Sequence, residues 1–591
     1  MRVPALFVLS AWLLIALSAH AQTFVEGRIE ADTTWQASGN PYVLTGDVEV
    51  GGGATLTIEE GTWIQGGVGA RLVIGGETTD DLGTLLVLGG PRPVRFTERE
   101  FRDRWGGIVF RPGAVPAEFD EAGLYRTGSL IRGAEIDDAM RPITMDQVYA
   151  YLEDVEILIG LDNTRAAILI DLPRVSAVEM RAARVTVKNG LGGGMRINYG
   201  GPKVLTDCVF EENYGVGLLV WSLSSIARDS THVVSRCTFR NNENRSGRES
   251  DGGGAWLVGY GEWQVVDCVF ENNTSSRNGG GLMAQATDSV TLAGCTFEGN
   301  RAPNSGGGVD LNAEVVLVEH CHFMANTAGT SAGGMLSVTR SAFPSTGIRA
   351  TVRECVFENN RAGRGGALTL DGDVELLERN RFISNASTTG GGAIRFINNA
   401  LETRLVDNVF ESNATAGVGG AVSFITSYDR RNVEFVGNVF DGNSARLGGA
   451  VHTSHIDDDR SQFDLSPVNG LFNTFTNNTA QLGDAIYHAG PVDIDATGVC
   501  WGTSVPAAIA NRIYDGRDGP GLGIVSFDPV APDCEDCRVD LDGDGALTLF
   551  DYLAFSGLFG LGDLQADFDG DGALTIFDFL LFQTEFQAGC P

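Results

Sequence analysis

Lysine is almost absent from the sequence, and this shortage sets the first limit on function. Only two of the 591 residues are lysines, Lys188 and Lys203, and histidine occurs seven times. Aspartate and glutamate outnumber lysine and arginine by 76 to 42, which gives a formal net charge of -34. A chain this acidic repels phosphate backbones and anionic lipid surfaces, so nucleic acid is a poor candidate partner.

Long apolar runs and a collagen period are also missing. Glycine is abundant, at 79 residues, but no Gly-X-Y period runs through the chain. After the N-terminal segment no apolar run reaches the 18 residues that a membrane-spanning helix needs. Hydrophobic residues still make up 43% of the chain, which is enough to bury a large core and argues against wholesale disorder.

The N-terminus has the pattern of an export signal. Arg2 is followed by an apolar run, residues 5–17, and then by Ala19-His20-Ala21, a small-x-small cleavage site. We expect residues 1–21 to be a signal peptide and the mature chain to begin at Gln22; an uncleaved anchor is the alternative. The pattern predicts a secreted, extracellular protein in an oxidising compartment, where disulfides can form.

A repeat fills the middle of the chain. A phenylalanine is followed three positions later by an asparagine, and successive phenylalanines lie 25 to 35 residues apart. Most copies are followed by a glycine pair and a small or aliphatic residue, as in Gly391-Gly392-Ala393. Between these marks lie short β-branched runs such as residues 315–318. The pattern occurs at Phe210/Asn213, Phe239/Asn242, Phe270/Asn273, Phe297/Asn300, Phe323/Asn326, Phe357/Asn360, Phe382/Asn385, Phe410/Asn413, Phe440/Asn443 and Phe475/Asn478.

These repeats predict a parallel β-solenoid. One set of short strands cannot bury its apolar face alone, but equivalent coils stacked about 4.8 Å apart build a continuous core. We expect phenylalanine above phenylalanine inside the stack. Asparagine should lie above asparagine at a turn, where its amide bonds the backbone and the next asparagine and where left-handed backbone is tolerated. Glycine pairs should form the sharp corners. A β-propeller would need a longer, steadier period, and the glycine content disfavours helical solenoids.

The Phe-x-x-Asn and Gly-Gly-Ala repeats resemble those of polymorphic outer-membrane proteins of the chlamydial type, over residues 200–490. The resemblance implies a right-handed parallel β-helix of the pectin-lyase-like fold. Those proteins end in a membrane-inserting barrel, which has no counterpart here, so their autotransport mechanism is not implied. We expect opening coils and a cap over residues 22–130, the β-helix over 131–530, a linker at 531–536 and a small module at 537–591.

Six cysteines occupy one position of the repeat, two residues before the phenylalanine. Later repeats place Asn380, Asn408, Asn438 and Asn473 there, so a cysteine ladder gives way to an asparagine ladder. Buried small side chains at a corner are the simplest interpretation, and stacked disulfides or a metal site are the alternatives. No CxxC or histidine spacing marks a zinc site among these six. They are Cys208, Cys237, Cys268, Cys295, Cys321 and Cys355.

The C-terminal residues contain a tandem duplication with the spacing of calcium-binding loops. Each copy places oxygen donors at positions 1, 3, 5, 7, 9 and 12, with glycine at position 6 for the sharp turn, and calcium requires six to eight such oxygens. The sequence therefore predicts two Ca²⁺ ions. The predicted ligands are Asp540, Asp542, Asp544, Ala546 through its carbonyl, Thr548 and Asp551, and in the second copy Asp567, Asp569, Asp571, Ala573, Thr575 and Asp578.

An amphipathic helix should follow each loop, at residues 551–559 and 578–586, whereas no convincing helix precedes either loop. A duplicated loop and exiting helix with aspartate at position 12 resembles a dockerin rather than a calmodulin-type pair. The closest variant is the GC type, because the chain ends in Gly589-Cys590. The resemblance implies calcium-dependent folding, a cohesin-like receptor or anchoring protein, and attachment at a cell surface. It also implies a disulfide from Cys590 to Cys537 or to Cys534.

Loop positions 10 and 11 are where dockerins carry partner contacts. Here they hold Leu549-Phe550 and Ile576-Phe577, which are apolar, unlike the hydroxyl pairs of cellulosomal dockerins. Cellulosomal cohesin recognition is therefore not implied. The alternative is that these four residues pack the small core of the module.

The enzymes among right-handed β-helices raise the question of catalysis. Polysaccharide lyases need a carboxylate cluster for Ca²⁺ and a basic residue, and hydrolases need paired carboxylates. The acidic candidates are not accompanied by Gly-His-Gly or Arg-x-Lys elements, and acidic runs are usually solvated loops. We therefore favour a non-catalytic, adhesive or carbohydrate-binding rod over a tethered lyase or glycoside hydrolase. The alternative predicts two carboxylates beside an arginine in a cleft lined with Trp or Tyr, within about residues 190–260. The acidic candidates are Asp137-Asp138, Asp371/Asp373 and Asp457-Asp458-Asp459.

Overall fold

The computed structural model describes residues 22–588 with gaps, and it divides them into two compact units. One unit contains the residues up to 173 together with 180–198, and the other contains 174–179 and the chain from 199 onward. The segments outside the described residues are 1–21, 101–103, 160–165, 175–178, 224–229, 246–249, 287, 339–348, 372–373, 398–402, 426–431, 455–461, 469–470, 532–538, 540, 542–546, 569–572 and 589–591. The predicted signal peptide and both predicted disulfide partners, Cys537 and Cys590, lie in these segments.

The first unit is built almost entirely of parallel strands. Its one antiparallel pair among the described residues joins β10 to β11, and a short 3-10 helix, η1, spans Ala37–Gly39. Its strands are β1 (Thr23–Ile29), β2 (Thr33–Trp35), β3 (Tyr42–Val50), β4 (Ala54–Glu59), β5 (Trp63–Gly66), β6 (Arg71–Ile74), β7 (Gly83–Leu88), β8 (Val94–Glu98), β9 (Gly107–Phe110), β10 (Glu118–Phe119), β11 (Tyr125–Thr127), β12 (Leu130–Asp137), β13 (Ile143–Asp146), β14 (Tyr151–Leu158), β15 (Ile168–Asp171), β16 (Met180–Lys188) and β17 (Met195–Asn198).

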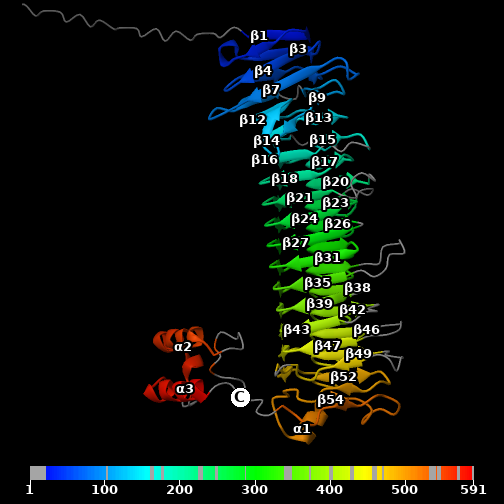
Figure 1. The fold of residues 1–591 in the computed structure, drawn as a ribbon, viewed down its shortest axis with the longest axis vertical. Coiled ribbons are helices and arrows are strands. Elements are labelled where there is room, and N and C mark those ends of the chain that lie inside the picture. The colour runs from blue at the N-terminus through cyan, green and yellow to red at the C-terminus, as the bar shows by residue number, and fades with distance from the viewer. Residues whose placement is uncertain are drawn as a thin grey trace, which may run out of the picture. The chain divides into compact units, whose positions relative to one another are not determined.

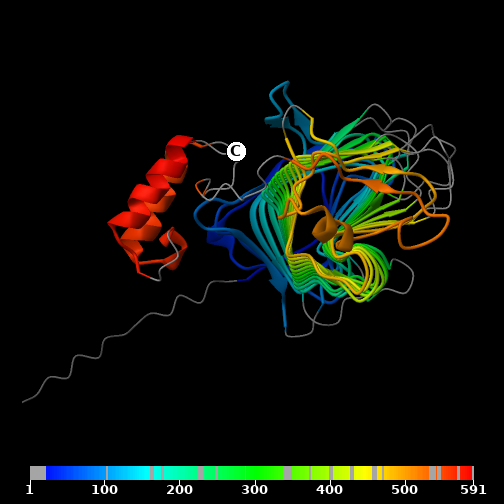
Figure 2. The same ribbon diagram turned by 90° about the horizontal axis from the view of Figure 1, so that it is seen from below.

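The second unit winds into coils that each contribute one strand to three parallel columns (Figures 1 and 2). The first column contains β18 (Lys203–Thr206), β21 (Thr231–Ser235), β24 (Glu262–Val266), β27 (Ser289–Ala293), β31 (Val315–Glu319), β35 (Arg349–Arg353), β39 (Val374–Glu378), β43 (Thr403–Val406), β47 (Asn432–Val436), β50 (Gln462–Asp464), β53 (Ile494–Asp495) and β55 (Val525–Ser526). The second contains β19 (Val209–Glu211), β22 (Thr238–Arg240), β25 (Val269–Glu271), β28 (Thr296–Glu298), β32 (His322–Met324), β36 (Val356–Glu358), β40 (Arg381–Ile383), β44 (Val409–Glu411), β48 (Val439–Asp441) and β51 (Thr474–Thr476).

The third column bears on function, because its outward face carries the polar and aromatic residues discussed below. A fourth, shorter column of two-residue strands, β29 (Arg301–Ala302), β33 (Thr327–Ala328), β37 (Arg361–Ala362), β41 (Ala386–Ser387) and β45 (Ala414–Thr415), lies between the second and third in sequence. The third column contains β20 (Leu218–Ser222), β23 (Ala255–Gly259), β26 (Leu282–Ala286), β30 (Val309–Asn312), β34 (Met335–Val338), β38 (Leu368–Asp371), β42 (Ile394–Ile397), β46 (Val422–Ile425), β49 (Val451–Ser454), β52 (Ile486–Ala489) and β54 (Ile513–Tyr514).

The phenylalanines of the repeat form one continuous stack inside the second unit. From Phe210 to Phe475 each ring lies on the next with centroids 4.6–5.2 Å apart and planes within 9° of parallel. Trp501 continues the stack beyond Phe475 at 5.2 Å. The spacing equals the separation of neighbouring strands, so each coil places its ring directly over the previous one. The prediction of stacked phenylalanines is therefore confirmed.

The repeat asparagines form a buried hydrogen-bonded ladder from Asn213 to Asn478. Each amide donates from Nδ2 to Oδ1 of the asparagine in the next coil, at 2.8–3.1 Å. The expectation of left-handed backbone at these asparagines was wrong. Positive φ falls on the preceding residue, as at Asn241 (φ 54) and Asn272 (φ 53), because a turn there aims the following amide along the stack.

Glycine pairs form the corner that leads into the third column. The first glycine of the pair has positive φ, as at Gly391 (φ 65) and Gly419 (φ 67). A Cβ on the second, Gly392 or Gly420, would collide with a carbonyl oxygen of the next coil, so only glycine allows the coils to approach this closely. The predicted role of the pairs is confirmed.

The six cysteines of the ladder are buried, as is Cys500, and Cys237, Cys268, Cys295, Cys321 and Cys355 are free thiols. Within the ladder, the backbone N–H of Cys321 donates to Sγ of Cys355 at 3.4 Å. The ladder then changes chemistry, because the N–H of Cys355 donates to Oδ1 of Asn380 at 3.0 Å. These residues therefore form a column of small buried side chains, and no stacked disulfides link them.

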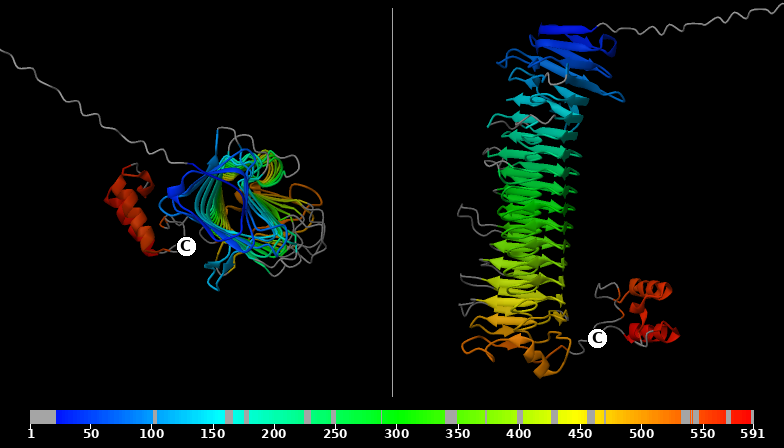
Figure 3. Two further views of the ribbon diagram at one scale, coloured as in Figure 1. Left: turned by 90° about the horizontal axis from the view of Figure 1, so that it is seen from above. Right: turned by 180° about the vertical axis from the view of Figure 1, so that it is seen from behind.

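Helices occur near the end of the second unit, as Figure 3 shows. They are α1 (Pro506–Asn511), α2 (Leu549–Leu561), the 3-10 helix η3 (Leu564–Ala566) and α3 (Ile576–Ala588). No helix within the described residues is long and apolar enough to cross a membrane.

Candidate functional site

The two C-terminal helices begin with the same capping arrangement. The backbone N–H of Thr548 donates to Oδ2 of Asp551 at 2.8 Å, and the N–H of Phe550 donates to Oγ1 of Thr548 at 3.1 Å. In the second copy Thr575 pairs with Asp578 at 2.7 Å, and Phe577 N–H donates to Thr575 at 3.1 Å. This reciprocal cap satisfies amide groups that a helix start leaves without partners. Both helices extend two residues beyond the predicted bounds at each end, and these caps account for the earlier start at loop position 10.

The core of this module is aromatic and self-contained. Phe555, Phe568 and Phe582 are buried together with Val539 and Ala566, and Tyr552 and Phe586 pack against them. Phe555 and Phe582 hold the same place in the two copies, 27 residues apart, and their rings stack at 4.0 Å. The duplication seen in the sequence is therefore a duplication in packing.

The four apolar residues at loop positions 10 and 11 stand outside this core. Leu549 and Phe550 are 68% and 67% exposed, and Ile576 and Phe577 are 61% and 66% exposed. The interpretation that these four residues pack the core of the module was wrong. They occupy the first two positions of α2 and of α3, where side chains point away from the helix–helix contact.

The described loop residues are of the kind that calcium requires. Thr548, Asp551, Asp567, Ala573, Thr575 and Asp578 all offer oxygen, and the Asp551 and Asp578 carboxylates are fully buried. Among the described residues no group of three or more His, Cys, Asp or Glu side chains is placed to hold a metal. Five of the predicted aspartates, with Ala546, lie outside the described residues, namely Asp540, Asp542, Asp544, Asp569 and Asp571. Where they can be compared with calcium chemistry, the residues fit: hard oxygen donors only, with carboxylate at position 12.

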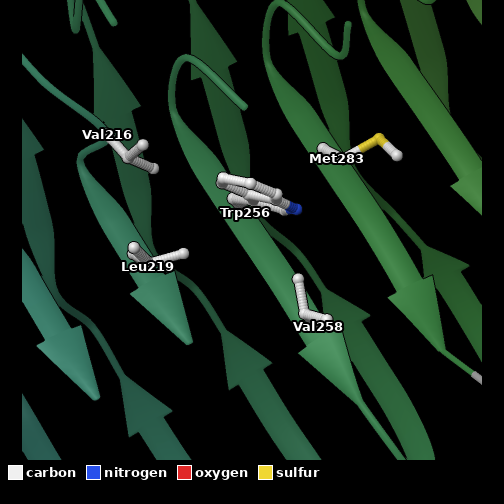
Figure 4. Packing of buried hydrophobic residues seen from close by; sticks show 5 residues of the cluster. All are labelled: Val216, Leu219, Trp256, Val258 and Met283. Carbon is white, nitrogen blue, oxygen red and sulfur yellow. The ribbon is translucent and has the colours of Figure 1, made fainter. Parts of the chain in front are cut away.

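A second cluster lies on the outward face of the third column. Figure 4 shows Leu219, Trp256 and Met283 on three successive strands, with Val216 and Val258 beside them. Trp221 meets Trp256 edge to face at 5.9 Å. The indole N–H of Trp256 is buried and has no hydrogen-bond partner among the described residues. An unpaired buried donor costs on the order of 1–3 kcal/mol, so its retention calls for an explanation.

Two buried carboxyl groups lie near this aromatic cluster. Asp310 follows Trp256 and Met283 in the same outward row, and Asp251 stands at the corner before β23. Burial, with the nearby charge of Asp251, raises the pKa of Asp310 to about 8. Asp251 accepts hydrogen bonds from the backbone and side-chain amides of Asn278, at 3.2 and 2.9 Å. Burial raises the pKa of Asp251, and Arg277 and the Asn278 hydrogen bonds offset part of this rise. Asp310 is therefore an acid that stays protonated at neutral pH beside one that is held by hydrogen bonds.

Of the acidic candidates drawn from the sequence, only Asp137, Asp138 and Asp371 lie within the described residues. Asp137 is half-buried and burial raises its pKa to about 6, and Asp138 beside it has positive φ. Asp371 ends β38 on the third column, whereas Asp373 and residues 457–459 lie outside the described residues. Sequence reasoning missed Asp310, although its place two residues after a glycine corner, like that of Trp256, was a usable signal.

Part of the β-helix matches a known protein family. Residues 225–361 match a protein family described as right handed beta helix region. The match and the parallel columns make the coils of the second unit a right-handed parallel β-helix, and Trp256 and Asp310 lie within the matched span. No curated protein matches the chain.

Proposed function

We propose that this chain is a secreted β-helix protein held to a receptor by its C-terminal module, which binds two Ca²⁺ ions and docks as dockerins do. The β-helix then serves as a non-catalytic surface for adhesion or carbohydrate binding. The observation that carries this proposal is the exposed apolar pair repeated in both copies, Leu549-Phe550 and Ile576-Phe577. Bound calcium would neutralise the loop carboxylates and fix the ends of both helices.

Three features support docking through these pairs. They stand at equivalent places on two helices whose own core is already complete without them. Leaving four large apolar side chains more than 60% exposed is unfavourable unless a partner covers them. Clustered aromatic and aliphatic anchors also typically supply most of the binding energy at an interface. A cohesin-like receptor with an apolar contact face is the matching partner.

The test is binding of the full chain to immobilised cohesin modules in calcium and in chelator. Phe550→Ser with Phe577→Ser should weaken binding at least 100-fold while leaving calcium binding intact. Leu561→Ser is the matched control, because Leu561 is 86% exposed but lies at the end of α2 and has only Ala588 as its counterpart. Equal weakening by the control, or binding unaffected by chelator, would remove the proposed docking role.

A second candidate function rests on Asp251 and Asp310. A protonated carboxyl near a second carboxylate, with an arginine and a tryptophan beside them, is the arrangement the hydrolase alternative calls for. In that case Asp310 would donate the proton to a leaving sugar oxygen. Release of reducing sugars from a polysaccharide panel, lost in Asp310→Asn, would support it. No release by the native chain would leave the non-catalytic role.

A further inference from the structure

The outward row of the third column changes character beyond Asp310. Strand register places Arg395, Ser423, His452, Tyr487 and Tyr514 over one another on successive coils. Adjacent strands are about 4.8 Å apart, so the first three side chains cover about 10 Å of this face. Arg364 and Arg446 stand at the neighbouring glycine corner, where both are exposed.

Arg395 and the two corner arginines, Arg364 and Arg446, have no carboxylate partner among the described residues. Elsewhere in the same unit arginines pair with acids one coil away, as Arg236 does with Asp207 at 2.8 Å and Arg240 with Glu211 at 2.8 Å. Arg395 instead extends to the corner, with Nη1 3.5 Å from where a Cβ would stand on Gly390. Burial and the charge of Arg364 both lower its pKa. The chain has a net charge of -34, so acidic residues are abundant, yet these arginines lie near one another without a carboxylate among the described residues to pair with them.

Three buried polar atoms of the row also lack partners among the described residues. They are Nε of Arg395, Oγ of Ser423 and Nδ1 of His452, and they lie on three consecutive coils. Ser423 is fully buried and His452 is 5% exposed. Burial, together with the nearby Arg395, His488 and Arg446, lowers the pKa of His452 to about 4, so the imidazole is neutral and can donate a hydrogen bond. Hydrogen-bond donors without partners, next to guanidinium groups without a carboxylate partner, can together bind an anion.

We propose that this row binds oxyanion groups, sulfate esters or carboxylates, carried on a glycan chain. We call it the anion row, and it consists of Arg364, Arg395, Ser423, His452 and Arg446. The guanidinium groups would pair with the oxyanions, because their planar forks bind such groups through two hydrogen bonds. Ser423 and His452 would complete the contacts at Arg395. Three of four consecutive coils carry a positive charge, from Arg364, Arg395 and Arg446, which suits a ligand that is itself a chain.

Aromatic rings next to the row favour a glycan over an acidic peptide. His452 stacks on Tyr487 with centroids 5.5 Å apart, and Tyr487 stacks on Tyr514 at 4.7 Å. Both tyrosines are only partly buried, so their ring edges and hydroxyls border the charged positions. Such amphipathic rings offer a sugar an apolar edge and a hydrogen-bonding hydroxyl. The anion row is independent of the calcium module.

The experiment measures binding of the full chain to dextran sulfate by calorimetry, with neutral dextran of the same length alongside. The combined variant Arg364→Gln, Arg395→Gln, Arg446→Gln should lose at least 30-fold in affinity. The control variant Arg236→Gln, Arg353→Gln, Arg379→Gln has the same net charge but removes arginines that are already paired, and should lose no more than 3-fold. Ser423→Ala deletes a hydroxyl that has no hydrogen-bond partner among the described residues, so the variant should fold normally and bind 3- to 10-fold more weakly.

Other binding results would overturn or refine the proposed anion row. Equal losses in both arginine variants, or equal binding of neutral dextran, would overturn the proposal. Binding of poly-glutamate as tightly as either acidic glycan would replace the glycan by an acidic peptide and also overturn it. Polygalacturonate binding in place of dextran sulfate would identify carboxylate as the bound group, and binding of neither would refute the site. Receptor docking is read out separately, so failure here leaves the module's role standing.

Discussion

Phe555 and Phe582 stack face to face, with ring centroids 4.0 Å apart and planes inclined by 6°. They occupy the same position in the two copies of the C-terminal repeat, so the module is held together by a contact between equivalents. Both side chains are fully buried, whereas the apolar pairs five and six residues earlier in each sequence copy are exposed. One set of apolar residues therefore forms the core, and the other is exposed on the surface of the module.

Loss of this contact should unfold the module without unfolding the β-helix. Phe555→Ala is expected to cost about 3–5 kcal/mol, the usual range for a buried phenylalanine. Limited proteolysis at increasing urea should show the last 55 or so residues cleaved while the rest of the chain stays intact. Leu553→Ala is the control, because Leu553 is 54% exposed and should cost well under 1 kcal/mol. Equal sensitivity of the two variants would contradict the packing described here.

The point where the cysteine ladder meets the asparagine ladder allows a second prediction. In Cys355→Asn the new amide can accept from the N–H of Cys321 and donate to Oδ1 of Asn380 and to the carbonyl of Val318, as Asn380 does to Val352 at 2.8 Å. We expect stability unchanged or raised by about 1 kcal/mol. Cys355→Val fits the space but removes the acceptor for Cys321, at a cost of about 1–3 kcal/mol. Denaturation midpoints of both variants test this, and an asparagine variant less stable than the valine one would contradict the ladder.

Asp310 should make stability fall as pH rises. Its pKa is about 8 in the folded chain and close to 3.9 when unfolded. Between these values the unfolded state releases a proton that the folded state keeps, so folding loses on the order of 5 kcal/mol by pH 8 and nothing at pH 3. Asp310→Asn removes this loss and should be more stable than the native chain at pH 8 but not at pH 3. Denaturant unfolding at both pH values measures the difference, with the exposed Asp146→Asn as control. A difference that does not change with pH would rule this out.

The interior of the β-helix could be predicted from the sequence, whereas most of its exterior could not. Phenylalanine and asparagine, as at Phe357 and Asn360, repeat from coil to coil, and most coils also repeat the glycine corner, because the stack forces the same side chain into the same place. The outward row of the third column has no such constraint, and it runs from Trp256 through Asp310 to Arg395 with a different residue at almost every step. Coil length varies from 25 to 35 residues, so only the strand register shows which outward residues are neighbours.

The C-terminal module shows the same division. Duplicated spacing predicted two loops and two helices, and the caps at Thr548 and Thr575 place the helix starts two residues earlier than the hydrophobic pattern indicated. The pattern could not separate core from contact residues, because Phe550 and Phe555 both lie at apolar positions of one helix. Their opposite exposure, 67% and 0%, follows from the packing of α2 against α3.

The most direct measurement is a calorimetric calcium titration of the full chain stripped of metal. We expect two Ca²⁺ ions per chain. Asp551→Asn and Asp578→Asn should each reduce the count to one or weaken one site at least 10-fold, because each removes the carboxylate at position 12 of one loop. Glu585→Gln, at a partly buried position on α3 with no place in either loop, should leave both sites intact. A chain that binds no calcium, or two aspartate variants that bind as the native chain does, would contradict the calcium-dependent docking module.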